Sequence, residues 1–132
     1  MRLPTPTPVP TLVYVAGPYR GDVAANVRFA VRASYELWVR GFVPITPHAL
    51  GFTLEQYGIP VFAEFETSVL MPGMIAIMSR CNAVCLLPGW EASSGTLQEK
   101  AEAERLNIPC IELRDFLIFP VRLDEPKWGI QP

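Results

Sequence analysis

Two short segments of the sequence combine residue types that bind phosphates and sugars. The first, residues 17–22 (GPYRGD), contains Gly17, Tyr19, Arg20 and Gly21. Glycine lets the backbone approach a ligand closely, arginine presents a forked cation, and tyrosine offers a ring for stacking. These residues predict contacts with a nucleotide-like ligand. An exposed arginine in a tight turn is the structural alternative, and the sequence alone leaves it open.

The second segment, residues 88–96 (PGWEASSGT), ends in two serines, a glycine and a threonine. A helix that begins here presents free backbone N–H groups, hydroxyls and the positive end of its dipole to an anion. A serine that only caps the helix explains one of these residues but not the cluster. We therefore predict that Ser93, Ser94 and Gly95 contact a phosphate or a ribose. Trp90, in the same segment, either forms a wall of the pocket or covers the core.

Two side chains are candidates for chemistry or ligand contact. Glu99 lies four residues after Gly95, so the two share a helix face. A carboxylate in the first turns of a helix is expected to stay ionised, which suits a nucleophile better than an acid. Residues 96–99 also match a capping box, which would give Glu99 a structural role only. His48 follows the second predicted strand, and it is either a ligand contact or a structural histidine.

The pattern of apolar residues predicts the elements that position these side chains. Short apolar runs predict four strands, at residues 12–16, 42–45, 83–87 and 108–113. Apolar residues at helical spacing predict three helices, over residues 23–40, 60–80 and 95–106. Pro72-Gly73 interrupts the second helix, and Pro44 favours an edge position for the second strand. Residues 46–58 are predicted as a loop with at most one helical turn.

The helical spacing also predicts which residues face the core. In the first helix these are Val27, Ala30, Val31, Ser34, Leu37 and Trp38, and in the last they are Leu97, Ala101 and Leu106. Strict alternation of strands and helices predicts an α/β fold, a flavodoxin- or Rossmann-like three-layer sandwich with a parallel sheet of four to five strands. Such sheets bind ligands at the carboxyl ends of their strands, where both polar segments lie.

Composition limits the possible functions. The chain has 132 residues, enough for one domain, and a net charge of −2 with half of its residues apolar. No block of lysines and arginines exists, which argues against binding to polymeric nucleic acid. No apolar run is long enough to span a membrane. Three cysteines in apolar runs favour buried thiols in a reducing cytoplasm, and metal binding by Cys81 and Cys85 is not expected.

The sequence divides into three parts. Residues 1–11 are rich in proline and threonine, unlike a signal peptide, and we expect a flexible leader. Residues 12–115 are predicted to form the α/β domain. Residues 116–132 hold aromatic and apolar residues among prolines, and we expect this tail to pack on the domain or on a neighbouring subunit.

Three motifs together resemble the nucleoside 2-deoxyribosyltransferase superfamily. They are residues 13–21 (VYVAGPYRG), 47–48 (PH) and 87–99 (LPGWEASSGTLQE). The resemblance covers residues 12–113 and is nearest to a branch of small proteins with a Gly-Trp-Glu-x-Ser-x-Gly loop, some similar to nucleoside monophosphate N-glycosidases. It implies a flavodoxin-like sheet and cleavage or exchange of the N-glycosidic bond of a deoxynucleoside or its 5′-monophosphate. It implies no metal or redox cofactor.

The resemblance also implies roles for individual residues. The nucleophilic glutamate of the superfamily falls on Glu99, and its nucleotide-binding loop includes Gly17 and Arg20. Six residues before the nucleophile, enzymes for free nucleosides carry Asp, whereas monophosphate hydrolases carry Ser. Ser93 stands at this position, so the resemblance favours a nucleoside 5′-monophosphate. Members are commonly homo-oligomers, which predicts a dimer or tetramer here.

The sequence departs from the superfamily at the residue that helps protonate the leaving base. Met74 stands where an Asp is usual, and Asn82 replaces another Asp. Glu64 and Glu66 are the candidates to substitute. Two functions therefore remain open, an N-glycosidase (hydrolase or base-exchange enzyme) and a non-catalytic nucleotide sensor. A purely structural interaction domain is a third alternative.

Overall fold

The computed structural model describes residues 11–61 and 63–122. Its sheet contains the strands β1 (Leu12–Ala16), β2 (Val43–Ile45), β3 (Ala83–Leu86) and β4 (Cys110–Glu112). The strands lie in the order β2-β1-β3-β4, and every pair is parallel. The predicted α/β, flavodoxin-like fold is confirmed, and so is the edge position of β2, the strand that contains Pro44.

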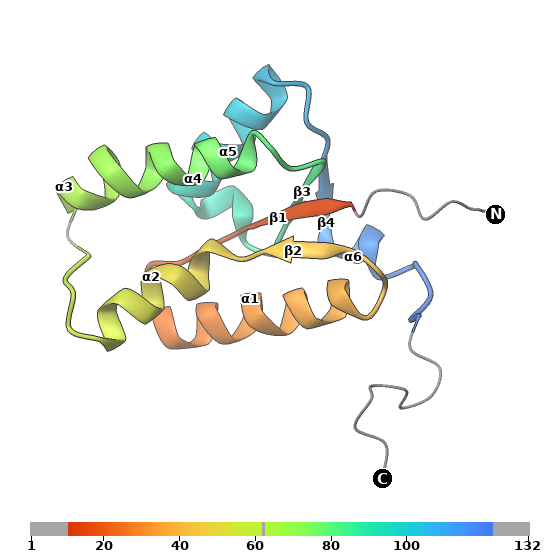
Figure 1. Ribbon diagram of the computed structural model, residues 1–132, viewed down its shortest axis with the longest axis horizontal. Coiled ribbons are helices and arrows are strands. Elements are labelled where there is room, and N and C mark those ends of the chain that lie inside the picture. The colour runs from red at the N-terminus through yellow and green to blue at the C-terminus, as the bar shows by residue number, and fades with distance from the viewer. Residues whose placement is uncertain (1–10, 62, 123–132) are drawn as a thin grey trace, which may run out of the picture.

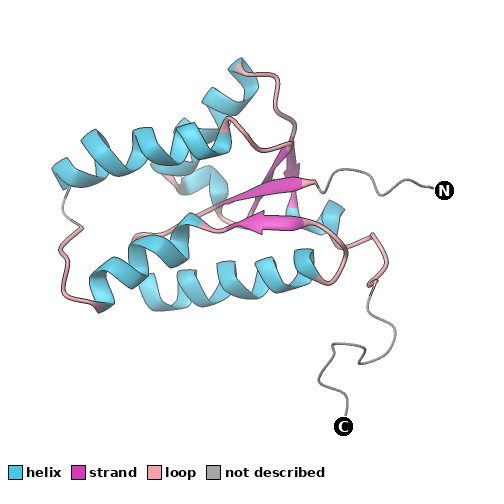
Figure 2. Ribbon diagram, viewed as in Figure 1, coloured by secondary structure: helices cyan, strands magenta, loops and turns pink. Residues whose placement is uncertain are grey.

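Helices alternate with the strands along the chain (Figures 1 and 2). The longer helices are α1 (Val23–Trp38), α2 (Pro47–Gln56), α4 (Met71–Met78) and α5 (Ser94–Arg105). The shorter elements are α3 (Ala63–Phe65), the π-helix η1 (Glu66–Leu70), the 3₁₀-helix η2 (Trp90–Ala92) and α6 (Leu113–Phe116). None of the helices in the described part of the chain is long and apolar enough to cross a membrane.

The sheet has a hydrophobic core on each face. Successive strand residues point to opposite faces, so Val13 and Val15 lie in one core while Tyr14 and Ala16 lie in the other. The first core is completed by α1 and α6, and the second by α4 and α5. Figure 1 shows α1 and α2 on one side of the sheet and α4 and α5 on the other. The carboxyl ends of β1 and β3 open between these two layers.

In two helices, α1 and α5, some of the residues predicted to face the core are exposed. In α1 the prediction was wrong for Val31 and Trp38, which are 49% and 55% exposed. In α5 it was wrong for Leu97 and Ala101, which are exposed. The inward face of α5 consists instead of Thr96, Glu99 and Ala103. The apolar pattern misleads in α5 because this helix turns polar groups inward, toward a cavity.

Two further differences concern the segment between β2 and β3. Residues 46–58, predicted as a loop, form the helix α2, which has Pro47 in its first turn, where a missing N–H is tolerated. The helix predicted over residues 60–80 has a π-helical segment directly before α4. Pro72 cannot donate a hydrogen bond to the preceding turn, and a widened turn is a common accommodation of such a break.

The described part of the C-terminal tail packs on the domain. Phe116 is buried, and the ring of Phe42 makes edge-to-face contacts with Phe116 and Phe119 at centroid distances of 5.2 and 5.3 Å. The N–H of Arg122 donates to the carbonyl of Val39. The predicted leader, apart from Thr11, and residues 123–132 of the tail lie outside the described residues.

Of the three free cysteines, Cys81 and Cys85 are buried and Cys110 is partly buried. 

Candidate functional site

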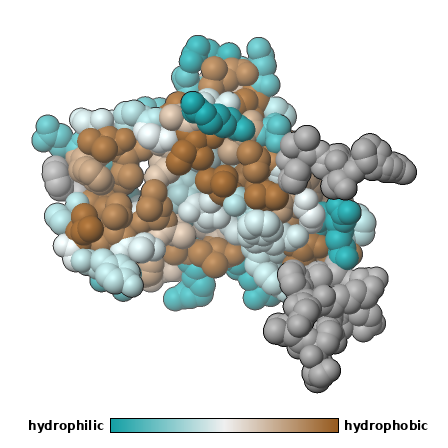
Figure 3. Space-filling model, in the orientation of Figure 1, coloured by the Kyte–Doolittle hydropathy of each residue, from teal (hydrophilic) through white to brown (hydrophobic). Residues whose placement is uncertain are grey.

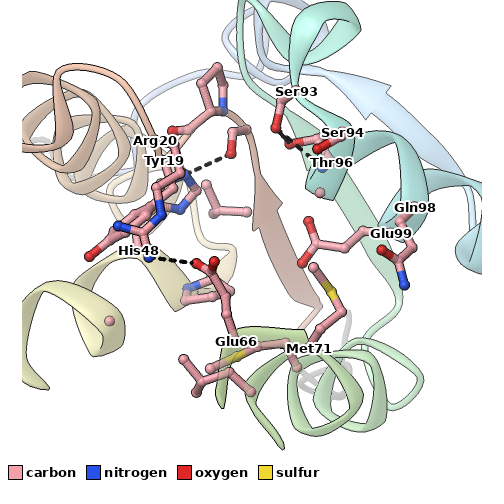
Figure 4. Close-up of a pocket in the computed structure, with 18 of the residues that line it drawn as sticks. Tyr19, Arg20, His48, Glu66, Met71, Ser93, Ser94, Thr96, Gln98 and Glu99 are labelled. Carbon is pink, nitrogen blue, oxygen red and sulfur yellow. Dashed lines mark hydrogen bonds and ion pairs between the residues drawn. The ribbon is translucent and has the colours of Figure 1, made fainter. Parts of the chain in front are cut away.

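A cavity of about 570 Å³ opens at the carboxyl edge of the sheet. Four parts of the chain line it: the loop after β1, the start of α2, the stretch from η1 to α4, and the start of α5 (Figure 4). The predicted site residues that line it are Gly17, Tyr19, Arg20, His48, Ser93, Ser94, Gly95 and Glu99. Gly21 and Trp90 are not among its lining residues.

The two glycines of the first segment, Gly17 and Gly21, allow backbone conformations and contacts that a side chain would prevent. A Cβ at Gly17 would lie 2.6 Å from the Cβ of Leu87, so this glycine allows the loop to pack closely on the end of β3. Gly21 has φ +101°, a conformation that side chains disfavour, and it directly precedes the N-cap of α1, Asp22. The amide of Asn26 donates to the carbonyls of Tyr19 and Arg20, both at 3.1 Å, which holds the loop in place.

Arg20 is held by a cluster at one wall of the cavity. Its guanidinium lies 3.0 Å from a carboxylate oxygen of Glu66 and 3.7 Å from one of Glu55, and it donates to the carbonyl of Val61 at 3.1 Å. The hydroxyl of Tyr19 donates to Glu55 at 2.7 Å. The side chain of Arg20 is 50% exposed and lies in a bend, as the structural alternative expected, but its guanidinium is also paired with carboxylates. The cluster joins the first loop to α2 and η1.

His48 connects the first loop to α2. Its Nε2 lies 3.1 Å from the carbonyl oxygens of both Gly17 and Pro18, so Nε2 carries the proton and donates. Nδ1 is therefore a bare acceptor, and among the described residues it has no hydrogen-bond partner. Burial lowers the pKa of His48, which keeps the ring neutral. The side chain is thus a fixed support of the loop that also lines the cavity.

The second segment forms the start of α5, with Ser93 as its N-cap. The Oγ of Ser93 accepts hydrogen bonds from the backbone N–H of Thr96 at 3.3 Å and from its hydroxyl at 2.9 Å. Both lone pairs of Ser93 are then occupied, while its own O–H has no acceptor among the described residues and remains a donor. The capping-box interpretation of residues 96–99 was wrong, because α5 begins three residues earlier than that motif requires.

Trp90 occupies η2 and packs against the core beside α5. The ammonium of Lys100 lies 5.4 Å from the centre of its ring, a cation–π contact. Of the two roles considered for this residue, the structure therefore supports covering the core.

Glu99 is the most deeply buried carboxyl group of the cavity. The residue is 8% exposed, and its Oε2 accepts a hydrogen bond from the hydroxyl of Tyr14 at 2.6 Å. Burial raises the pKa of Glu99 to about 7, although the hydrogen bond from Tyr14 acts in the opposite direction. The expectation that Glu99 stays ionised was wrong in this respect, since the helix position favours the charge less than burial disfavours it.

Sequence reasoning missed Tyr14. Residues 12–16 are a buried apolar strand, and nothing in their spacing indicates a partner 85 residues away. One signal was present, because a tyrosine hydroxyl inside a core strand needs a hydrogen-bond partner. Burial, followed by the charge of Glu99, raises the pKa of Tyr14, so the phenol stays protonated and acts as a donor.

The residues that depart from the superfamily pattern lie in different places. Met74 is buried and lines the cavity, so the wall is apolar where an acid was expected. Asn82 lies at the opposite edge of the sheet, where its side chain accepts from the N–H of Leu12 at 2.7 Å. Of the two candidate substitutes, Glu66 lines the cavity, whereas Glu64 is exposed and does not. The described residues contain no group of His, Cys, Asp and Glu placed to hold a metal ion.

In the comparison with family models, residues 11–113 match a domain of unknown function (DUF7768). The chain belongs to this family. The DUF7768 match spans the whole sheet and includes every residue that lines the cavity. A comparison with curated proteins finds no match.

Proposed function

We propose that this protein is an N-glycosidase, a hydrolase or base-exchange transferase, that acts on a nucleoside 5′-monophosphate with Glu99 as the nucleophile. The resemblance to the nucleoside 2-deoxyribosyltransferase superfamily implies this activity. The observation that carries the proposal is the convergence on one cavity of a buried carboxyl group and an anion-binding helix end. A cavity of about 570 Å³ lies within the usual size range of small-molecule sites.

The start of α5 is the proposed phosphate site. Ser94 and Gly95 lie in the first turn, where backbone N–H groups have no helical partner and the helix dipole favours an anion. The O–H of Ser93 adds a donor, and its role as N-cap fixes the position of that donor. A carboxylate in place of Ser93 would repel the phosphate, which agrees with the Ser-for-Asp distinction within the superfamily.

Glu99 and Tyr14 form the proposed reaction centre. Tyr14 holds Oε2, which leaves Oε1 to attack C1′ as the bond from C1′ to the base breaks. The product is a glycosyl ester of Glu99, which water or a second base then resolves, as in a retaining glycosidase. Only the ionised carboxyl group attacks, so the rate is expected to depend on the raised pKa of Glu99.

The second candidate is a nucleotide-binding sensor without turnover. The apolar side chain of Met74 favours it, because an apolar wall supplies no proton to a leaving base. Both candidates use the same phosphate contacts, so binding alone does not separate them.

We also propose that the protein forms a homo-oligomer in the cytoplasm. Hydrophobic side chains gather on the surface near α2 and α3 (Figure 3). Leu50 in α2, Ile59 after it and Val69 in η1 are 44%, 47% and 56% exposed. A second copy would cover this surface beside the cavity. Light scattering during size-exclusion chromatography tests the proposal, and a monomer at micromolar concentration would contradict it.

Base release is the test of the main proposal. The purified protein and its Glu99→Ala variant are incubated with ribo- and deoxynucleoside 5′-monophosphates, and free base is separated by chromatography. Release by the wild type alone supports the glycosidase and identifies the base. Binding in calorimetry without release supports the sensor. Neither release nor binding leaves only a structural role for the domain.

A further inference from the structure

The outward side of α1 carries large side chains that the core does not cover. Val31, Tyr35 and Trp38 are 49%, 55% and 55% exposed, and Arg28 is exposed one turn earlier. These four residues are three or four positions apart, so they form one outer stripe along the helix. Single exposed apolar residues are common on protein surfaces, whereas a continuous stripe that combines aromatic residues with arginine is typical of a binding surface.

The same side of α1 has an excess of positive charge. The guanidinium of Arg32 lies 6.0 Å from the centre of the Tyr35 ring, and the Arg32 side chain is 76% exposed. The carboxylate of Glu36 lies 3.6 Å from Arg32 but 2.7 Å from Arg40, so one negative charge serves two cations. Arg28 has no ion-pair partner among the described residues. A ligand of this surface is therefore expected to carry carboxylates as well as apolar groups.

The described part of the chain ends beside the C-terminal end of α1 (Figure 1). The carbonyl of Phe119 accepts a hydrogen bond from Nε of Arg40 at 2.9 Å, and the N–H of Arg122 donates to the carbonyl of Val39. Val39 is the C-cap of α1. The chain thus continues from one end of the outer stripe.

The sequence that follows complements the outer stripe. Residues 123–132 (LDEPKWGIQP) contain the carboxylates of Asp124 and Glu125, a single lysine, and the apolar residues Trp128 and Ile130. Carboxylates pair with arginine, and a tryptophan ring packs on apolar side chains and on guanidinium groups. A second copy of α1 complements the stripe less well, because two such surfaces face to face would bring their arginines together.

The length of this segment also matches the outer stripe. An extended chain advances about 3.3 Å per residue, and a helix advances about 1.5 Å. Measured from the C-cap of α1, Arg32 and Arg28 lie about 10 and 16 Å back along the helix. Measured from the end of the described chain, Glu125 and Trp128 can reach about 10 and 20 Å. The carboxylates therefore reach the nearer arginine, and the tryptophan ring reaches the farther one.

We propose that residues 123–132 bind along the outer stripe of α1 in the same molecule, antiparallel to the helix, with their carboxylates beside Arg32 and with Trp128 on the stripe. This inference does not depend on the proposed function. The bound segment covers the exposed aromatic side chains. It also ties the segment to the helix that directly follows the first loop of the cavity.

Chemical crosslinking of the full-length chain tests the position of the segment. Arg32→Lys keeps the positive charge and supplies an amine, which a carbodiimide joins directly to a carboxylate in contact with it. Mass spectrometry should then find amide crosslinks between position 32 and Asp124 or Glu125. Lys100 is a native lysine on α5, on the other side of the sheet, and it should give no crosslink to these two residues (Figure 1).

Isotope labelling identifies the molecule that supplies the segment. The reaction is run on an equal mixture of unlabelled and nitrogen-15-labelled protein. Crosslinks that join two peptides of the same isotope, without mixed pairs, support the proposal. Mixed pairs would show that a second copy supplies the segment, and a lack of crosslinks from position 32 would leave the stripe to another partner. Either of these results overturns the proposal.

Proteolysis measures the same contact without a crosslinker. Trypsin cleaves after Lys127, and binding of the segment slows this cleavage because only the unbound form is cut. The double variant Arg28→Glu, Arg32→Glu should raise the rate at this bond at least about fivefold, the effect of about 1 kcal/mol. The control Arg105→Glu, Arg114→Glu makes the same change in net charge at exposed sites elsewhere and should leave the rate unchanged. Equal rates in all three proteins would overturn the proposal.

Discussion

The two carboxyl groups of the cavity, Glu66 and Glu99, differ in what surrounds them. Glu99 is buried beside the neutral donor Tyr14, and the pKa of Glu99 is about 7. The side chain of Glu66 is 34% exposed, and one of its carboxylate oxygens lies 3.0 Å from the guanidinium of Arg20. One residue type thus meets two environments within one cavity. Enzymes that use two carboxyl groups often place them in unlike environments, so that the two groups have different pKa values and different catalytic roles.

The largest expected effect comes from replacing Glu99, the proposed nucleophile. Glu99→Gln keeps the shape of the side chain but cannot form a stable ester, so base release should fall by about 10⁴-fold or more. Nucleotide binding, measured by calorimetry, should persist because the phosphate contacts remain. A variant that still releases base at a tenth of the wild-type rate would assign the nucleophile elsewhere.

The second effect is on stability and concerns Glu99 alone. The folded protein holds the Glu99 proton up to about pH 7, whereas the ordinary value is 4.5. This contribution to stability is therefore fully present below about pH 4.5 and is lost as the pH rises to about 7. Its size is on the order of 3 kcal/mol. Urea denaturation from pH 5 to pH 8 measures this loss.

Two variants isolate that pH dependence. Glu99→Gln has no proton to lose, so its free energy of unfolding should fall less than that of the wild type between pH 5 and pH 8. Glu104→Gln, an exposed site on the same helix, should behave like the wild type. Equal pH dependence in all three proteins would show that Glu99 is not buried in the way described.

Tyr14→Phe tests the hydrogen bond that distinguishes Glu99 from Glu66. The hydroxyl of Tyr14 lowers the pKa of Glu99 against the effect of burial, so its loss should move the midpoint of the pH–kcat/KM profile to higher pH. A hydrogen bond to a charged group is worth about 2 kcal/mol, which corresponds to a loss of about 30-fold near neutral pH. A smaller kcat/KM with an unchanged midpoint would contradict this assignment.

The smallest expected effect comes from two substitutions of Ser93, which distinguish its role as the N-cap of α5 from its proposed role as a phosphate contact. Ser93→Ala removes the N-cap of α5 and should lower the free energy of unfolding by about 1 kcal/mol. Ser93→Asp keeps a capping side chain and hence stability, but its charge repels phosphate and should shift binding from the nucleotide toward the free nucleoside. Thermal melts and calorimetry measure the two effects. Equal nucleotide affinity in Ser93→Asp and the wild type would show that the phosphate does not bind at this helix end.

Much of the site followed from local patterns. The segment at residues 93–95 was predicted because a cap and an anion site both belong to the start of one helix, and the strand before it ends at the edge where parallel sheets bind ligands. Glu99 followed from its distance to that start. Trp90 was ambiguous in sequence because an aromatic residue suits both a pocket and a core, and only its packing on the core separates the two.

Other features were outside the reach of local patterns. Leu97 and Ala101 fit an inward face of α5, yet Thr96 and Glu99 face inward because the cavity, rather than an apolar layer, lies beneath this end of the helix. The π-helix at Glu66–Leu70 lies in a stretch whose residues also suit an ordinary α-helix. Arg20 was identified as a cation, but its carboxylate partners lie 35 and 46 positions away.

The sequence by itself determined the alternation of strands and helices, the two polar segments at strand ends and Glu99 as a candidate, because spacing and turn residues act over a few positions. Only the tertiary structure decided the partner of Glu99, the proton affinity of that carboxyl group and the presence of Glu66 on the opposite wall. These depend on burial and on contacts between β1, η1 and α5, and such contacts form only when the parallel sheet brings distant segments together.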